Sequence, residues 1–485
     1  MAATRIRLTS DPGDDELHRT FDAIRAELEV PTDFPPEALA EAERVAREQR
    51  TTGTDLTDVP FVTIDPVGSM DLDQAMHLER DGQGVRVRYA IADVPLWVDP
   101  GGAVDAEARR RGQTVYAPDQ RTPLHPTVLS EDAASLLPGV VRPAFVWDLR
   151  VDADGQVRLE GLDRAMVRSA ARLDYDGVQR DLDDGRADEL LLLLREVGLS
   201  RMAQERARGG ASLPMPEQEV HPDPAGGYTL ELRPLAPVED WNAQISLMTG
   251  MAAASVMLEG GVGILRTMPP AAPRDLQRLR RQCATLGVPW PEDQPYGEML
   301  QGLDRRDPRH LAVIHAATSL FRGASYTPFD GQPPEQTQHA ALAADYAHVT
   351  APLRRLVDRF GLAVCEALVA GQPVPDWARA ALPDLPELMK ASDRRAKGVE
   401  RACTDAVEAA VLQPHVGEVF AAGVVEQGDK GPALVQLTGH PILAPCRGEV
   451  ELGQQVQVRL VEASVAERRV TFEAVGPGAN EQRTA

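Results

Sequence analysis

Three aspartates lie within nine residues of each other near the start of the chain: Asp65, Asp71 and Asp73. A short run of β-forming residues, 61–64, precedes Asp65 and is predicted to place it at the end of a strand. Asp71 and Asp73 are two residues apart, and such residues share a face in an extended segment. Crowded carboxylates repel each other unless a cation lies between them. The alternative is an acidic turn whose aspartates are solvated.

The chemistry of such a cluster follows from its oxygen ligands, which suit Mg²⁺ or Mn²⁺. A bound cation of this kind can in turn hold a phosphate group. Two cations about 4 Å apart can activate a water molecule and stabilise the leaving oxygen of an in-line displacement at phosphorus. The acidic segment therefore indicates metal-assisted phosphoryl chemistry.

The spacing of the acids resembles the catalytic signature of the ribonuclease II/ribonuclease R exoribonuclease family, in which an aspartate is followed by others six, eight and nine positions later. Asp65, Asp71 and Asp73 match the first three positions, and Gln74 occupies the fourth. A glutamine oxygen can coordinate a cation, but without negative charge. The resemblance implies that Asp65 and Asp71 bind metal and that Gln74 is a weak ligand. Asp73 would bind metal and orient or deprotonate the attacking water.

A second segment, residues 346–359, resembles the family's Thr-Ser-Pro-Ile-Arg-Arg/Lys-Tyr-x-Asp run. Ala351 replaces the serine and Leu356 replaces the aromatic residue. The resemblance implies that Arg354 binds the scissile phosphate and stabilises the charge that develops on it. For Arg355 we expect either an RNA contact or an ion pair with a protein carboxylate.

The same segment contains a signal for the start of a helix. Thr350 is a residue type that caps helices, and Pro352 suits a first helical turn. The N–H groups at a helix start favour an anion. We therefore expect a helix that begins near Pro352, with Arg354 at its start.

Four further residues lie in short blocks that resemble family segments. Tyr116 falls where the family stacks an aromatic ring on a base, and Tyr175 is a second candidate for a nucleotide contact. Glu239 or Asp240, at the start of a predicted helix, would contact the terminal ribose or nucleotide. The alternative for Tyr116 is a core tyrosine with a bonded hydroxyl. For the two acids, it is a role in stabilising the helix start.

The elements that must position these residues predict an α+β protein. Residues 1–50 are predicted to be a small helical region, similar to a helix-turn-helix and without room for the paired cold-shock domains of family members. Residues 53–412 resemble the family's RNB-type catalytic domain, a sheet with surrounding helices. Residues 415–475 contain short alternating strands typical of an OB-fold β-barrel that binds RNA. Residues 476–485 are predicted to be a disordered tail.

The net charge of −23 is unusual for a protein that binds nucleic acid, because such proteins usually have a basic surface. Four basic clusters interrupt the acidic sequence, and each is more often a solvated helix face than a phosphate contact. The clusters are 109–111, 278–281, 354–355 and 394–397. We expect a basic channel inside an acidic exterior.

Other features of the sequence bear on where in the cell the protein is located. No apolar run reaches the roughly 18 residues that span a bilayer, and the N-terminus lacks the apolar core of a signal peptide. The four cysteines are far apart and have no metal-ligand spacing, which indicates buried thiols in a reducing compartment. We therefore expect a cytoplasmic monomer that does not bind membranes.

The resemblance implies a hydrolytic, Mg²⁺-dependent 3′→5′ exoribonuclease, with Mn²⁺ as the alternative metal, that degrades single-stranded RNA processively to 5′-monophosphate nucleotides. Two other hypotheses remain open. The first is an RNA-binding protein with a weakened catalytic domain, which Gln74 and the altered residues near Arg354 favour. The second is an acidic metal-binding or interaction protein that does not engage RNA, which the net charge favours.

Overall fold

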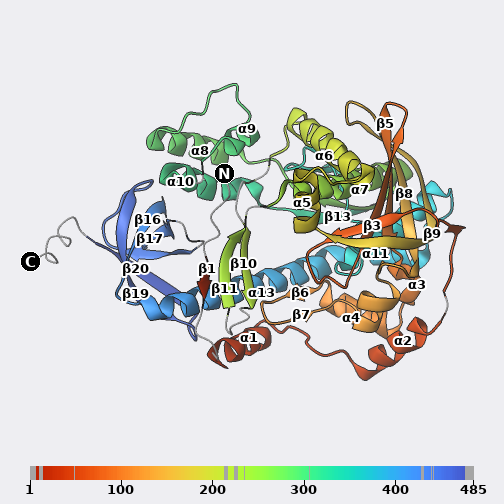
Figure 1. Cartoon of the computed structure of the whole chain (residues 1–485), viewed down its shortest axis with the longest axis horizontal. Helices are drawn as coiled ribbons and strands as arrows, with labels where there is room; N and C mark the ends of the chain where they lie inside the picture. Colours follow the sequence, from red (N-terminus) through yellow and green to blue (C-terminus); the bar gives the residue numbers. More distant parts are fainter. Residues whose placement is uncertain are drawn as a thin grey trace, which may run out of the picture.

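The structure is a computed structural model of the 485-residue chain. It describes residues 7–9, 15–48, 50–211, 213, 217–222, 228–233, 235–304, 306–427, 431–438, 440 and 442–475. The tail expected at 476–485 lies outside the described residues. The arrangement confirms a mixed α+β fold, with a larger body built on a central sheet and a separate small barrel (Figure 1).

The central sheet has six strands. In spatial order they are β2 (Thr54–Asp55), β9 (Val157–Asp174), β3 (Phe61–Asp65), β4 (Gln74–Asp81), β5 (Gly84–Ala92) and β8 (Val141–Val151). The long strand β9 also pairs with β8, so it joins the two ends of the run from β3 to β8. The strand predicted at 61–64 is therefore present as β3, in the middle of the sheet.

Both faces of the sheet are covered, because successive side chains of a strand point to opposite sides. Along β5, Tyr89 and Ile91 pack into one hydrophobic cluster, whereas Ala90 and Ala92 pack into another. The first cluster lies beneath α5 (Tyr175–Asp183), α6 (Glu189–Ala207), α7 (Pro237–Gly260) and α11 (Leu356–Val369). The second lies against α2 (Pro36–Ala46), α3 (Val94–Trp97) and α4 (Ala103–Arg111). Figure 1 shows α6 and α7 on the side of the sheet opposite to α2 and α4.

The N-terminal segment is spread over two parts of the molecule. Strand β1 (Arg7–Thr9) pairs with β11 (Tyr228–Arg233), which pairs in turn with β10 (Glu217–Pro222). Helix α1 (Asp15–Glu27) packs against the long helix α13 (Leu385–Leu412), through residues such as Phe21 and Val399. Helix α2 packs instead on the central sheet. The two N-terminal helices therefore join different hydrophobic clusters, and β1 forms because a distant segment supplies its partner strand.

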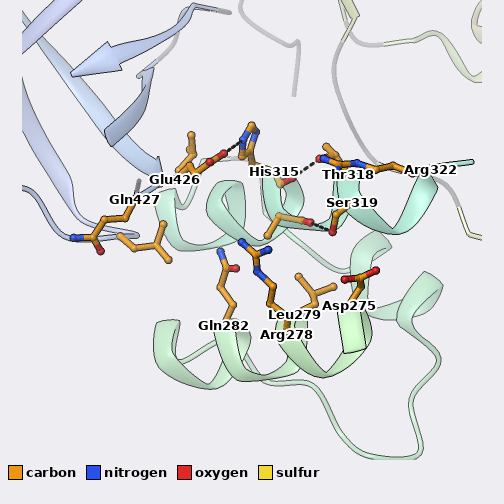
Figure 2. A pocket seen from close by; sticks show the side chains of 13 residues that line it. Asp275, Arg278, Leu279, Gln282, His315, Thr318, Ser319, Arg322, Glu426 and Gln427 are labelled. Atoms are coloured by element: carbon orange, nitrogen blue, oxygen red, sulfur yellow. Dashed lines mark hydrogen bonds and ion pairs between the residues drawn. The ribbon is translucent and has the colours of Figure 1, made fainter. Parts of the chain in front are cut away.

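A group of helices connects the larger body to the barrel. Its members are α8 (Pro273–Leu286), α9 (Tyr296–Gln301) and α10 (Pro308–Ala317). Helix α10 contacts the barrel strand β16, and the ring of His315 is bonded to Glu426 at 2.8 Å across this junction (Figure 2). A cavity of about 540 Å³ lies beside this pair. The residues that line it do not include any expected site residue.

The C-terminal region is a closed five-stranded barrel, as predicted. Its strands are β16 (Val419–Glu426), β17 (Ala433–Leu437), β18 (Leu443–Arg447), β19 (Gln455–Ser464) and β20 (Arg469–Ala474). The remaining short elements are β6 (Val115–Tyr116), β7 (Arg121–Thr122), β12 (Val262–Thr267), β13 (Ser325–Asp330), β14 (Gln338–His339), β15 (Ala344–Asp345) and α12 (Asp376–Ala381). Across the described ranges, none of the helices combines the length and the apolar character needed to span a bilayer.

Candidate active site

The acidic segment is a loop between two neighbouring strands. Strand β3 ends at Asp65 and β4 begins at Gln74, so Asp71 and Asp73 lie in the connection. The buried side chain of Ser135 fixes this loop: its hydroxyl donates to the carbonyl of Met70 at 2.6 Å and accepts the N–H of Leu72 at 3.0 Å. Sequence reasoning did not single out Ser135, because a lone serine has no distinctive pattern.

Asp73 joins the acidic loop to the arginine segment, 280 residues further along the chain. One carboxylate oxygen accepts the N–H of Leu353 at 2.7 Å, and the other lies 3.6 Å from Nε of Arg354. Asp73 is buried, whereas the Arg354 side chain is 43% exposed. Burial raises the pKa of Asp73 well above its ordinary value, although Arg354 and the Leu353 N–H oppose the shift. The two motifs predicted to act together therefore meet at one carboxylate.

The prediction of a helix that starts near Pro352 is wrong. Helix α11 begins at Leu356, and Arg355 is extended, with φ −132° and ψ 124°. Its backbone forms a β-bridge to Gln113 instead. The carbonyl of Arg354 accepts the N–H of Thr114 at 3.0 Å. These backbone groups bind a neighbouring segment, so Arg354 lies in a turn before the helix.

Arg355 is held by a protein carboxylate, which was one of its two expected roles. Its Nε and Nη2 atoms lie 3.0 and 2.8 Å from the two carboxylate oxygens of Asp358. Asp358 is fully buried and also accepts the N–H of Ala351 at 2.7 Å. This carboxylate therefore fixes the shape of the turn that presents Arg354.

Gln74 makes a second link between the loop and the turn. Its side-chain Nε2 donates to the backbone carbonyl of Thr350 at 2.5 Å. An aspartate at this position could not donate this hydrogen bond, because a carboxylate is an acceptor only. The amide nitrogen of Gln74 is therefore engaged, and only its oxygen is left for the weak metal-ligand role that was expected.

Asp71 already has cationic and hydroxyl partners. Arg121 Nη1 lies 2.7 Å from one of its oxygens, and the hydroxyl of Tyr116 donates to the other at 3.3 Å. Arg121 also pairs with Glu131 at 2.7 Å. Tyr116 is 50% exposed, so its ring is accessible and not part of the core. Sequence reasoning did not identify Arg121, because only the folded chain brings it to Asp71.

Asp65, at the end of β3, interacts electrostatically with Tyr175, the first residue of α5. Burial and the neighbouring Asp71 raise the pKa of Asp65 to about 6. Burial, and then Asp65, raise the pKa of Tyr175 to about 12. The Tyr175 hydroxyl accepts a hydrogen bond from Asn242 of α7 at 3.1 Å. Tyr175 therefore lies close enough to Asp65 for their charges to interact, and Asn242 is a further residue that sequence reasoning missed.

The paired acids of α7 lie in its first turn. Glu239 accepts the N–H of Ala236 at 2.8 Å, which stabilises the start of the helix, as the alternative reading predicted. Asp240 is exposed, and partial desolvation, followed by the charges of Glu239 and Glu205, raises its pKa. The bond to Ala236 therefore gives Glu239 a structural role that does not require a nucleotide.

The carboxylates fit one divalent cation better than two. Within the described ranges, no three His, Cys, Asp or Glu side chains converge closely enough to form a complete metal site. The raised pKa of Asp65, however, reflects burial and, second, repulsion from Asp71, which a cation between them would relieve. The oxygen ligands match those of Mg²⁺ or Mn²⁺. A second cation beside Gln74 does not fit, since that side chain is neutral and bonded to Thr350.

The basic clusters of the sequence are in part internal. All three arginines of 109–111 pair with acids of their own helix: Arg109 with Asp105, and Arg110 and Arg111 with Glu107. This cluster stabilises α4 and is not a phosphate-binding surface.

Comparisons with known proteins were made for the whole chain. Residues 53–367 match the family described as the RNB domain, and residues 418–475 match the RNase II-type exonuclease C-terminal S1 domain. Ribonuclease R of Escherichia coli (strain K12) is 26% identical over 486 residues, which cover 89% of this chain and 58% of that protein. The chain therefore spans less than two thirds of the length of this curated relative.

Two solved structures share the fold. "Mycoplasma genitalium RNase R in complex with ribose methylated single-stranded RNA" has a TM-score of 0.86 at 18% identity and covers 95% of this chain and 78% of that one. "Structure of yeast Ssd1, a pseudonuclease" has a TM-score of 0.68 at 15% identity and covers 92% of this chain and 58% of that one. One fold thus occurs in a ribonuclease and in a protein described as a pseudonuclease.

Proposed function

Because the chain belongs to the RNB domain family, we propose that it is an exoribonuclease that removes nucleotides from the 3′ end of single-stranded RNA by hydrolysis. The products would be 5′-monophosphate nucleotides, released processively with Mg²⁺ as the metal. The observation that supports this most strongly is the junction at Asp73, which contacts both Leu353 and Arg354. This contact between an acid and a partly exposed guanidinium supports the proposal that a phosphodiester binds at Arg354.

Asp73 and Arg354 have complementary roles in this proposal. Arg354 is partly exposed, so its guanidinium can bind a phosphate oxygen and stabilise the charge that develops during displacement. Asp73 has a raised pKa, which suits a group that orients a water molecule and accepts its proton. Asp65 and Asp71 would hold a divalent cation, which when bound supplies Lewis-acid chemistry at the phosphate.

The nucleotide contacts would come from two tyrosines near the acidic loop. Tyr116 is bonded to Asp71 and presents an exposed ring, which can stack on any base. Tyr175 lies near Asp65 and would position the terminal nucleotide together with Asn242. The barrel at 418–475 would hold RNA further from the cleaved bond.

A second candidate is an RNA-binding protein with weakened catalysis. The neutral Gln74 favours it, because that position provides one negative charge fewer than the family pattern. The fold shared with a protein described as a pseudonuclease is consistent with it. In this case the chain would bind single-stranded RNA but release no nucleotides.

The test is a time course with purified protein and single-stranded RNA labelled at its 5′ end, with Mg²⁺ or with a chelator. Loss of the full-length RNA with few intermediates is expected, together with release of 5′-monophosphates from a parallel, internally labelled RNA, and both should depend on Mg²⁺. An Asp73→Asn variant should bind the RNA without shortening it, whereas the matched variant Asp293→Asn, at an exposed aspartate before α9, should behave as the wild type. RNA binding with no shortening by the wild-type protein would favour the second candidate.

A further inference from the structure

A second cavity lies between the start of β9 and the helices α6 and α7. The two helices pack side by side (Figure 1). Its volume is about 520 Å³, within the range of small-molecule sites. The residues that line it do not include any residue of the candidate active site. Polar and apolar side chains share its wall; among them are Arg158, Arg201, Arg208, Met248, Met251 and Val256.

Arg201 is an exception among the buried arginines. Four arginines of the described ranges are buried: Arg25, Arg111, Arg201 and Arg359. Three of them pair with a carboxylate; the partners are Asp119, Glu107 and Asp105. Arg201 forms no such pair within the part of the chain that the structure describes. A buried charge is costly unless a partner compensates it. Among the described residues, Arg201 therefore lacks the carboxylate partner that the other three buried arginines have.

The hydrogen bonds of Arg201 do not replace that partner. Its Nη1 donates to the carbonyl of Gly155 at 2.7 Å, and its Nη2 lies 3.4 Å from the sulfur of Met251. Its Nε is buried and has no acceptor among the described residues. A thioether is a weak acceptor, so two of the three nitrogens are poorly satisfied.

Arg208 adds a second positive charge at the same place. Its Nη2 lies 3.9 Å from the same Met251 sulfur, and its Nε is likewise buried without a described acceptor. Burial lowers the pKa of Arg201 to about 10, and Arg208 contributes to the shift. Two acids lie nearby. Glu205, whose charge partly offsets those of Arg201 and Arg208, accepts from Gln244 at 2.7 Å, and Glu259, in the cavity wall, accepts from Ser255 at 3.1 Å.

The cavity beside α10 provides a contrast. Its arginines, Arg278 and Arg322, share the wall with Asp275 and Glu426, so charges of both signs are present (Figure 2). In the cavity between α6 and α7, two guanidiniums converge on a sulfur atom, and Glu259 lies in the wall. Arg201 is buried without an ion pair to a described acid, whereas Arg278 and Arg322 are exposed, so an anion would complete the second site and not the first.

We propose that the cavity between α6 and α7 binds a small phosphate-bearing ligand with an apolar body, such as a nucleoside monophosphate. Guanidinium groups bind phosphate oxygens in a bidentate manner, and Arg201 and Arg208 would share the phosphate. Met248 and Val256 would contact the apolar part of the ligand. The proposal does not depend on RNA hydrolysis, because binding alone defines the site.

The test uses the full chain without RNA or added metal, titrated with adenosine monophosphate, inorganic phosphate or adenosine. Calorimetry and thermal unfolding are the readouts. We expect the monophosphate to bind and to raise the melting temperature by a few degrees at saturation, as a ligand specific for the folded state does. Inorganic phosphate should bind more weakly, and adenosine should produce no shift. No shift with either anion, or an equal shift with adenosine, would overturn the proposal.

Variants locate the binding. Arg208→Gln, at a half-buried position, should weaken binding of the monophosphate about tenfold to a hundredfold, as expected for one charge-assisted contact. The matched variant Arg158→Gln removes an exposed arginine of the same wall that pairs with Glu160, and it should change affinity much less. Loss of binding in Arg354→Ala with retention in Arg208→Gln would place the ligand in the active site and refute the proposal.

Discussion

The candidate active site gathers negatively charged side chains, whereas the cavity between α6 and α7 gathers positively charged ones. In the first, burial and the neighbouring charge of Asp71 raise the pKa of Asp65 to about 6. In the second, Arg208 helps to lower the pKa of Arg201 to about 10. In the active site, Arg121 and Arg354 also lie beside the carboxylates. In the cavity, neither Arg201 nor Arg208 forms an ion pair with an acid of the described residues. Like charges held together predict a ligand of opposite sign, a cation at one site and an anion at the other.

The largest effect is expected at Asp73. Replacing it with asparagine removes the group proposed to accept the proton, although the amide oxygen can still accept the Leu353 N–H. Hydrolysis should fall by at least about a thousandfold while RNA affinity changes little. Single-turnover rates and RNA-binding titrations of the same preparation measure the two quantities. Substantial turnover by Asp73→Asn would show that this carboxylate does not act on the water.

Removal of the Arg354 guanidinium should have the next largest effect. Arg354→Ala is expected to reduce kcat about 10²- to 10³-fold, because one donor to the transition-state charge is lost. Arg354→Lys keeps the charge but not the forked geometry, so it should recover part of the rate. The comparison uses kcat and KM for a short RNA. A change confined to KM would mean that Arg354 binds the ground state and transition state equally.

The acidity of the medium should affect the cation site through Asp65. A carboxylate must be deprotonated to bind a metal ion, and the pKa of Asp65 in the metal-free protein is about 6. Metal affinity should therefore rise with pH up to about 6, roughly tenfold for each pH unit below that value, and become level above it. Calorimetric titration with Mn²⁺ between pH 4.5 and 7.5 tests this. An affinity that stays constant across pH 5 to 6 would exclude Asp65 from the cation site.

The smallest effect is expected at Gln74. Gln74→Asp removes the hydrogen bond to Thr350 and sets a carboxylate against a carbonyl oxygen. We expect a rate about tenfold lower and a lower melting temperature, because the link between the loop and the turn is lost. Gln74→Glu is the matched variant, because it also removes the hydrogen bond to Thr350 but keeps the length of the side chain. If Gln74→Asp instead tightened Mg²⁺ binding and raised the rate, the position would face the metal, as its place in the acidic motif suggests.

The sequence alone determined several features of this protein. The spacing of Asp65, Asp71 and Asp73 identified the acidic loop. A run of β-forming residues predicted the strand that became β3, and alternation predicted the C-terminal barrel. The Arg354 segment was also identified, although the helix after it starts four residues later than expected. These features depend on local spacing and on the two-residue repeat of strands, which adjacent residues encode.

The tertiary structure decided which groups meet. The contact of Asp73 with Leu353, the bond from Gln74 to Thr350 and the pairing of Arg121 with Asp71 all join distant segments. Such contacts have no local pattern in the sequence. The same reason applies to Arg201, which resembles any helical arginine until its burial is known. Charge balance depends on distance and burial, and only the folded chain sets both.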